Sequence, residues 1–238
     1  EEVKQYGNEY FTGDGQIVTE NLEGDDSRVI MDRVIPFIQN AKKNNKPFLA
    51  VIWFHTPHAP VIAGPEYREI YKNFSESKQN YYGCLTAMDE QIGRLRNELK
   101  EIGVENNTML WFCSDNGPSM QDESTKEGST GGLRGAKLSI FEGGIRVPGV
   151  LVWPDKISEP FEVDIPCVTS DYFPTILDAL GIPLPSDRPY DGISLMPVIE
   201  QKQKERNKPI GFLNRGGRQS VWMNRTYKLI YDEKEKHL

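Results

Sequence analysis

Apolar residues recur every three or four positions between residues 81 and 102, and this spacing predicts a helix. The stripe consists of Tyr81, Cys84, Leu85, Met88, Ile92, Leu95, Leu99 and Ile102. A period near 3.6 places these side chains on one helical face, which can be buried against the rest of the chain. Gly103 follows the stripe and suits the left-handed conformation in which many helices end. This is the clearest helix of the sequence.

Two further helices are predicted from capping residues and apolar spacing. Asp25, Asp26 and Ser27 offer an N-cap. Apolar residues follow at helical spacing up to residue 41. Pro36 lies inside that pattern and is expected to kink the helix or to split it, because proline has no amide hydrogen for the helical ladder. The other helix is expected to start at a cap formed by Ser170 or by the next residue, and to run to residue 180.

Continuous apolar runs of strand length predict three buried strands, at residues 48–54, 109–113 and 149–153. The long helix separates the first two, so these are expected to form a parallel βαβ pair. Alternating strands and helices predict an α/β fold. The interpretation is therefore a mostly parallel sheet flanked by helices.

The last part of the chain has a different pattern. Residues 200–208 are strongly charged and are interpreted as a solvated linker or helix. Short strand-like runs then follow, separated by turn residues, at 210–213, 219–223 and 227–231. We expect the α/β core to cover residues 1–200 and a small antiparallel sheet subdomain to cover residues 201–238.

Candidate metal ligands follow the second predicted strand, in the turn-forming stretch Ser114-Asp-Asn-Gly-Pro118. Asp115 and Asn116 would thus lie at the carboxyl end of a strand, where open α/β sheets bind ligands. Their oxygen atoms suit Ca²⁺ or Mg²⁺ better than zinc. A solvated turn is the alternative for an isolated Asp-Asn-Gly.

Further polar residues follow the other strands. The run 48–54 ends in His55-Thr-Pro-His-Ala-Pro60, so His55 or His58 is expected near the metal ligands if the two strands are neighbours. Arg134, Lys137 and Arg146 offer positive charge, and the paired glycines at 143–144 allow close approach of backbone to a ligand. Each cation alone would be interpreted as a surface ion pair. Together, beside an acidic turn, they indicate an oxyanion ester bound between a cation and a lysine.

Composition narrows the choice of partners. The net charge is -7 and no long Lys/Arg block occurs, so nucleic acid is not expected as a partner. No apolar run reaches the roughly 18 residues of a membrane span, and none has the pattern of a signal peptide. The cysteines Cys84, Cys113 and Cys167 are scattered and odd in number, which argues against a disulfide framework. Cys84 and Cys113 are interpreted as small core residues.

Four motifs in this order resemble those of the type I sulfatases, the formylglycine-dependent enzymes of the alkaline-phosphatase-like superfamily. The motifs are His55-Thr-Pro-His-Ala-Pro60, Ser114-Asp-Asn-Gly-Pro118, Arg134-Gly-Ala-Lys137 and Phe141-Glu-Gly-Gly-Ile-Arg-Val-Pro148. The resemblance runs from about residue 25 to the end of the chain. It implies an alkaline-phosphatase-like fold and a hydrolase of sulfate esters.

The resemblance also assigns roles to single residues. Asp115 and Asn116 match the pair that ligates the divalent cation, usually calcium, with Mg²⁺ as the alternative. His58 matches the histidine that contacts the sulfate and assists the leaving group. Lys137 matches the lysine that holds the sulfate and the bridging oxygen. His55 matches no catalytic residue and is interpreted as structural.

The family's nucleophile motif, Cys/Ser-x-Pro/Ala-x-Arg, does not occur in this sequence. The paired acidic metal ligands of the family's first strand are also missing, since Asp25 and Asp26 precede a predicted helix. In the family these groups lie N-terminal to the part matched here. The chain therefore resembles the C-terminal half of a sulfatase, formylglycine is expected in the missing N-terminal part, and this chain alone is expected to be inactive.

The expected function of the intact protein is hydrolysis of sulfate esters on a carbohydrate or aryl substrate, in an exported protein. Two alternatives stay open. A phosphatase or phosphodiesterase of the same superfamily would need a two-zinc site rich in Asp and His, and the chain has only three histidines. The other alternative is a non-catalytic binding protein. The sequence does not predict the oligomeric state.

Overall fold

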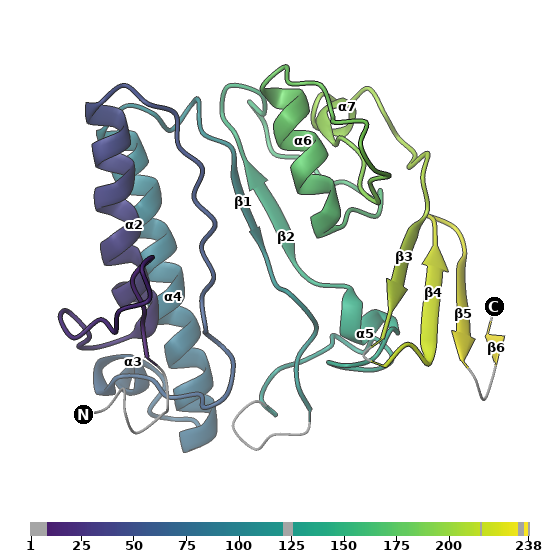
Figure 1. Cartoon of the computed structure of the whole chain (residues 1–238). Helices are drawn as coiled ribbons and strands as arrows, with labels where there is room; N and C mark the ends of the chain where they lie inside the picture. The colour runs from purple at the N-terminus through teal and green to yellow at the C-terminus, as the bar shows by residue number, and fades with distance from the viewer. Residues whose placement is uncertain (1–8, 121–125, 215, 233–235, 238) are drawn as a thin grey trace. The chain divides into compact units, whose positions relative to one another are not determined.

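The computed structural model describes residues 9–120, 126–214, 216–232 and 236–237. These residues form two compact units (Figure 1). Unit 1 comprises Glu1–Glu105 and Pro118–Ser129, and unit 2 comprises Asn106–Gly117 and Thr130–Leu238. The boundary at residue 200 that the sequence suggests stays a prediction.

Unit 1 is built on two long helices, α2 (Asp26–Lys43) and α4 (Glu76–Glu101), with the short helix α3 (Pro65–Ile70) between them in sequence. In α4 the predicted stripe is confirmed, with Cys84, Leu95 and Leu99 buried. The helix begins five residues before residue 81, because the Ser75 side chain caps it by accepting a hydrogen bond from the amide of Lys78. Helices α2 and α4 pack side by side within the unit (Figure 1).

Helix α2 continues through Pro36 as one helix of 18 residues. The expectation that Pro36 could split it is wrong, while a kink stays a prediction. A proline in a helix interior costs about 3 kcal/mol. Here the apolar residues on both sides, Ile35 and Ile38, are almost fully buried. Burying side chains of this size contributes about 1.5–3 kcal/mol each, which offsets the lost hydrogen bond.

Residues 48–54 form neither a helix nor a strand, so the strand predicted there is absent. Leu49, Val51 and Trp53 are 67%, 69% and 84% exposed, while the residues between them are half-buried. The alternation is that of an extended chain. A strand also needs a hydrogen-bonded neighbour, and among the described residues no ladder includes this segment. The parallel βαβ pair is therefore not observed.

Unit 2 contains the other two predicted strands, β1 (Leu110–Cys113) and β2 (Gly149–Val152). They pair antiparallel, with Leu110 opposite Val152 and Cys113 opposite Gly149. Helix α5 (Glu142–Ile145), the 3₁₀ turn η1 (Thr169–Asp171) and the helices α6 (Tyr172–Ala179) and α7 (Met196–Ile199) complete this part of the unit. Its core consists of Trp153, Ile165, Leu195, Val198 and Ile199.

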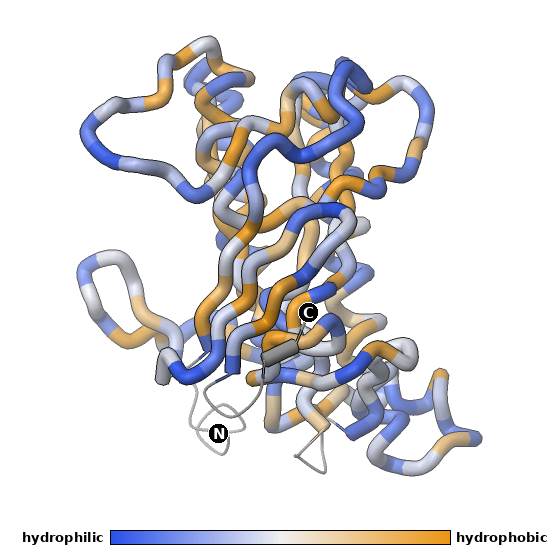
Figure 2. Tube along the Cα trace, turned by 90° about the vertical axis from the view of Figure 1, so that its right-hand side faces the viewer, coloured by the Kyte–Doolittle hydropathy of each residue, from blue (hydrophilic) through white to orange (hydrophobic). Residues whose placement is uncertain are grey.

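The predicted antiparallel sheet is confirmed at the end of unit 2. Its strands are β3 (Ile210–Leu213), β4 (Gln219–Met223), β5 (Lys228–Asp232) and β6 (Lys236–His237), in that spatial order. Their apolar residues can be followed in the hydropathy view of Figure 2. Val221 and Ile230 are buried on one face, where they pack with Ile140 from the segment before α5. The sheet thus supports the segment that carries Lys137.

The charged run 200–208 is not solvated throughout, because the side chain of Arg206 is fully buried. Two of its nitrogens contact the two carboxylate oxygens of Asp171 at 2.8 Å each. The same carboxylate accepts hydrogen bonds from the amides of Val168 and Ile193, both at 2.9 Å. A buried charge pair is tolerated when its remaining hydrogen-bonding positions are satisfied in this way. Arg206 therefore ties the linker to η1, and Asp171 ties η1 to the loop before α7.

Candidate functional site

The turn after β1 presents Asp115 and Asn116 just beyond the strand's carboxyl end, as the sequence predicted. The Ser114 hydroxyl donates to the Asn116 carbonyl at 2.9 Å, and the Asn116 amide donates to the Asp115 carboxylate at 2.9 Å. The Asn116 side-chain amide donates to the Gly117 carbonyl, also at 2.9 Å. Asp115 is exposed and Asn116 is half-buried. The turn is thus organised by its own polar groups and leaves the Asp115 carboxylate open to solvent.

Glycines join this turn to the segment around Lys137. The Gly117 amide donates to the Gly144 carbonyl at 2.8 Å, and the Gly143 amide donates to the Arg134 carbonyl at 2.8 Å. A Cβ atom on Gly117 would lie only 1.8 Å from the Gly143 carbonyl oxygen. A Cβ atom on Gly143 would lie 2.2 Å from the Gly135 carbonyl oxygen. The backbones therefore touch directly, and no side chain fits between them.

The sequence suggested that the paired glycines let backbone approach a ligand. The structure shows that Gly143 and Gly144 approach the protein's own backbone, and their approach to a ligand stays a prediction. Their effect on a site is indirect, because they fix the Asp115–Asn116 turn relative to the loop that carries Lys137. Both segments belong to unit 2, so the structure brings these three candidate residues into one backbone assembly.

Lys137 lies half-buried in a tight loop. Leu138 has a φ of +74°, in the left-handed region, and the Ser139 amide donates to the Ala136 carbonyl at 3.0 Å. Of the other two predicted cations, Arg134 places its guanidinium 3.8 Å from the centre of the Phe141 ring, and Arg146 is exposed. The Arg134 contact is a cation–π interaction within the protein, which leaves Lys137 as the cation best suited to an anionic ligand.

An ion pair fastens this assembly to the C-terminal sheet. The Lys228 ammonium lies 2.6 Å from the Glu142 carboxylate, and neither side chain is fully exposed. Together with the Ile140 cluster, this contact joins α5 to β5. The C-terminal sheet therefore acts as a base for the loop that carries Lys137.

His55 and His58 lie in unit 1, in the loop after residue 54. The His58 amide donates to the His55 carbonyl at 2.8 Å, and the two rings are 5.3 Å apart. The His58 Nδ1 atom lies 2.8 Å from the Ala59 carbonyl oxygen. Because a carbonyl can only accept, Nδ1 carries a proton and Nε2 is the ring atom left for another partner. The expected proximity of His58 to Asp115 stays a prediction, since these residues lie in different units.

A contact that the sequence did not suggest holds this loop. The Asp26 carboxylate accepts hydrogen bonds from the His55 amide at 3.3 Å and from the Thr56 hydroxyl at 2.9 Å. Asp26 is the first residue of α2, as expected for a residue that precedes a helix and not a strand end. In the sequence, Asp26 indicated only the polar start of a helix. That pattern does not specify a contact with residues 55–56.

The donor set at the turn fits part of a site for a hard cation. Ca²⁺ takes about six to eight oxygen ligands. Asp115 and Asn116 supply side-chain oxygens of the right kind. Within the described ranges, no group of three or more His, Cys, Asp and Glu residues could hold a metal ion. A cation bound by this pair would therefore need further ligands.

The three cysteines, all within the described residues, are free thiols, so the structure contains no disulfide among them. Cys84 is buried, as predicted. Burial, followed by the negative charges of Asp25 and Asp26, raises the pKa of its thiol to about 12. A thiol with such a pKa is protonated at neutral pH and is a poor nucleophile. Cys113 is half-buried in β1.

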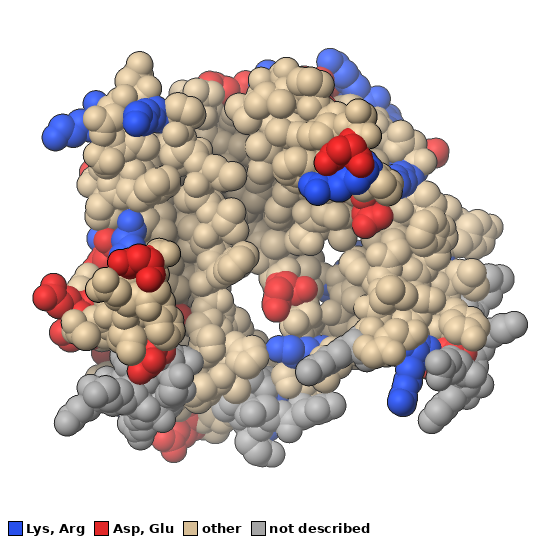
Figure 3. Space-filling model, in the orientation of Figure 1, with Lys and Arg blue, Asp and Glu red and all other residues tan. Residues whose placement is uncertain are grey.

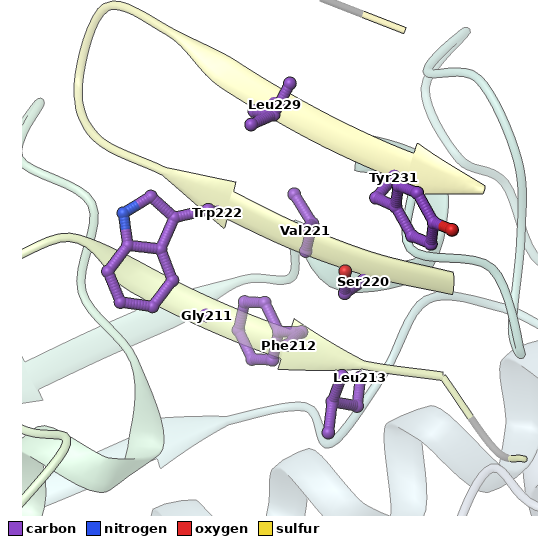
Figure 4. Close-up of a pocket in the computed structure, with 8 residues that line it drawn as sticks. All are labelled: Gly211, Phe212, Leu213, Ser220, Val221, Trp222, Leu229 and Tyr231. Carbon is purple, nitrogen blue, oxygen red and sulfur yellow. The ribbon is translucent and has the colours of Figure 1, made fainter. Parts of the chain in front are cut away.

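A pocket on the C-terminal sheet does not include these candidate residues. A pocket of about 430 Å³ lies on the outer face of the C-terminal sheet, where Trp222, Leu229 and Tyr231 contribute to its lining (Figure 4). It is mostly apolar and contains no titratable group suited to hydrolysis. On the face shown in Figure 3, Lys and Arg side chains are interspersed with Asp and Glu. No helix in the described part of the chain is long and apolar enough to cross a membrane.

Comparison with known proteins agrees with the motifs. A family model described as "Sulfatase" matches residues 3–182. Steryl-sulfatase of Homo sapiens is 35% identical over 173 residues, which cover 71% of this chain and 28% of the human protein. Arylsulfatase G of Rattus norvegicus is 29% identical over 218 residues, which cover 84% of this chain and 40% of that protein. The chain thus spans less than half the length of these relatives.

The fold is also found in solved structures. This chain matches the crystal structure of Ps i-CgsB in complex with k-i-k-neocarrahexaose with a TM-score of 0.80 and 23% sequence identity. The match covers 98% of this chain and 53% of that chain. The α/β architecture with a small antiparallel sheet is therefore the alkaline-phosphatase-like fold of sulfatases. Since the family model matches most of its length, this chain belongs to the sulfatase family.

Proposed function

We propose that the full-length protein carrying this sequence is a sulfatase that hydrolyses sulfate esters. One observation carries the proposal. In a chain of the sulfatase family, the glycine contacts hold the Asp115–Asn116 turn and the Lys137 loop in one rigid backbone assembly. An oxygen-rich turn and a lysine fixed to it suit an anion that binds between a cation and an ammonium group.

Asp115 and Asn116 would hold part of the coordination shell of a divalent cation. Both side chains offer oxygen donors, which suit Ca²⁺ or Mg²⁺. Calcium is the preferred ion because of the resemblance to the sulfatases, and Mg²⁺ is the alternative. When bound, such an ion neutralises charge on the sulfate oxygens and orients the ester. Asp115 contributes the negative charge that attracts the ion. Asn116, anchored through its side-chain amide to Gly117, contributes a neutral oxygen.

Lys137 would donate hydrogen bonds from Nζ to a sulfate oxygen and to the bridging oxygen. Charge builds up on the bridging oxygen as the S–O bond breaks, so a fixed cation stabilises the transition state more than the ground state. The tight turn around Leu138 limits the freedom of this residue before substrate binds.

His58 would act as the general acid. Nδ1 is held by the Ala59 carbonyl, so the imidazolium form presents its other proton on Nε2. Transfer of that proton to the leaving oxygen yields a neutral alcohol and a neutral imidazole. Attack on sulfur is the chemistry that a hydrated formylglycine supplies, and we place that residue in the part of the protein outside this sequence.

The proposed substrate is a sulfated carbohydrate or an aryl sulfate. The support comes from relatives and neighbours: a solved structure of this fold was obtained in complex with k-i-k-neocarrahexaose, and one relative is named an arylsulfatase. From the same family relationship we propose that the protein is exported.

The test is hydrolysis by the full-length protein of 4-nitrophenyl sulfate, phenyl sulfate and 4-nitrophenyl phosphate, with and without Ca²⁺. We expect sulfate esters to be the better substrates. His58→Ala should lower kcat/KM for phenyl sulfate by about 100- to 10,000-fold, the usual contribution of one general acid. His55→Ala, in the same loop, is the matched control and should have a far smaller effect. An unchanged rate in His58→Ala would refute the assignment.

Two outcomes would favour the other functions. Faster turnover of the phosphate ester, together with bound zinc, would indicate a phosphatase of the same superfamily. No turnover of any ester by the full-length protein would favour a binding role. The 238-residue polypeptide itself lacks the nucleophile motif and is expected to be inactive.

A further inference from the structure

The Asp26 carboxylate contacts the loop that carries His58 through both of its oxygens. One oxygen accepts the His55 amide at 3.3 Å and the other accepts the Thr56 hydroxyl at 2.9 Å. The residues that it holds lie 29 and 30 positions further along the chain. Both contacts are within unit 1, and they join the start of α2 to residues 55–56.

His55 connects the Asp26 carboxylate to His58. The His55 backbone is held at its amide by Asp26, and its carbonyl accepts the His58 amide at 2.8 Å. The His58 ring is then fixed at Nδ1 by Ala59. The Asp26 carboxylate thus helps to hold the His55 backbone, which is in turn bonded to the His58 amide.

Asp26 is not needed to cap the helix. That role belongs to Asp25, whose side chain accepts the Ser27 amide at 2.9 Å. The two neighbouring carboxylates thus have separate tasks, one toward its own helix and one toward the loop. A carboxylate in the first turn also interacts favourably with the helix dipole, but this gain does not require contact with a distant loop.

Asp26 belongs to a helix, α2, that is well packed. In α2, Val29 and Met31 are 1% and 0% exposed, and the helix packs along α4. Functional groups are held most accurately when residues on packed elements support them. A carboxylate at the end of such a helix can hold a loop that is not fixed by the hydrogen bonds of a sheet.

We infer that Asp26 is a positioning residue for His58, which holds the loop 55–60 in the geometry that proton transfer requires. The inference rests on the proposed role of His58 as general acid. Asp26 does not touch the substrate in this scheme. Its loss would therefore weaken the help given to the leaving group and would leave the other steps intact.

The experiment compares Asp26→Ala and Asp26→Asn with Asp25→Ser in the full-length protein. Serine at position 25 removes the neighbouring charge and keeps an N-cap, so this variant controls for charge and helix stability. Asparagine at position 26 keeps the shape of the side chain and one hydrogen-bond acceptor. This variant replaces Asp26→Ala in the comparison if the alanine variant fails to fold. Phenyl sulfate, whose leaving group needs a proton, is compared with 4-nitrophenyl sulfate, whose leaving group needs it less.

We expect Asp26→Ala to lower kcat/KM for phenyl sulfate by about 10-fold or more, a part of what a whole general acid contributes. The loss with 4-nitrophenyl sulfate should be smaller. In a His58→Ala background, Asp26→Ala should have almost no further effect, because the two residues act as one unit. Equal losses for both esters, or additive losses in the double variant, would overturn the inference.

Hydrogen–deuterium exchange of a peptide covering residues 53–60 gives a readout that does not depend on activity. Exchange should be faster in Asp26→Ala than in the wild type and unchanged in Asp25→Ser. If the wild type hydrolyses no sulfate ester, the proposed function fails, and exchange alone decides whether Asp26 holds the loop. If the wild type is active and depends on His58, but Asp26→Ala matches Asp25→Ser in rate and exchange, this inference alone fails.

Discussion

Gly117 and Gly143 lie in direct backbone contact, so closely that a methyl group on Gly117 would lie 1.8 Å from the Gly143 carbonyl oxygen. The contact joins the turn of Asp115 and Asn116 to α5 and, through Gly135, to the loop of Lys137. The Gly117 amide is also bonded to the carbonyl of Gly144, which holds the two backbone segments together. The candidate site therefore depends on these glycines as much as on its charged residues.

Gly117→Ala should consequently reduce both stability and activity. Overpacking in a well-packed region costs about 1–3 kcal/mol, which thermal or chemical unfolding can measure. Gly149→Ala is the matched control in the same unit, because a Cβ atom there meets nothing within 4 Å. An alanine at 117 with unchanged stability would show that the turn can separate from α5 at little cost.

Two glycines of helix α4 should respond in opposite directions to the same substitution. A Cβ atom on Gly93 meets nothing within 4 Å, whereas one on Gly83 would lie 2.7 Å from the Cβ atom of Ala63. Gly93→Ala should therefore stabilise the helix by about 0.5–1 kcal/mol, since alanine loses less backbone entropy on folding. Gly83→Ala should destabilise the protein. Unfolding midpoints of the two variants, measured side by side, check the signs, and a gain from Gly83→Ala would contradict the packing.

The buried pair of Asp171 and Arg206 is expected to be sensitive to the loss of one partner. Arg206→Met leaves the Asp171 carboxylate buried with only backbone amides as partners, which typically costs about 3–5 kcal/mol. The exposed pair of Arg225 and Asp164, 3.6 Å apart, is the comparison. Arg225→Met should change the free energy of unfolding by less than about 1 kcal/mol. Similar decreases in the free energy of unfolding of both variants, measured by denaturant melts, would mean that the buried pair contributes no more to stability than the exposed one.

The elements that the sequence predicted correctly are those that local pattern determines. The stripe of α4 and the glycine after it define that helix, and Gly103 has a φ of +70° as its position required. The short strands β3, β4 and β5 follow from alternation between turn residues. The turn at Asp115 follows from its own composition, since the side chains of Ser114, Asp115 and Asn116 make their hydrogen bonds with neighbouring residues.

What could not be predicted depends on partners far along the chain. The run 48–54 has the composition of a strand, yet strand formation also requires a neighbour, which the local pattern does not specify. Arg206 lies in a charged run typical of solvent, but its partner Asp171 is 35 residues away. The contacts of Asp26 with residues 55–56, and of Gly117 with Gly143, are of the same kind. Arginine, aspartate and glycine each occur in several structural roles, so the residue type alone does not indicate such a distant partner.

Asp32 links α2 to α4 and should make stability dependent on pH. The hydrogen bond from Asn21, followed by that from Arg94, holds its pKa below the ordinary 3.8. A lowered folded pKa means that the unfolded chain binds more protons as pH falls, so this contribution is present at neutral pH and is lost on acidification through the folded pKa. Asp32→Asn should therefore cost about 1 kcal/mol at pH 7, and the difference from wild type should shrink below about pH 4. Melts of both proteins between pH 3 and pH 7 measure this, with Asp89→Asn on α4 as the control for an exposed carboxylate. A difference that stays constant over this range would mean that the Asp32 carboxylate gains nothing from its partners.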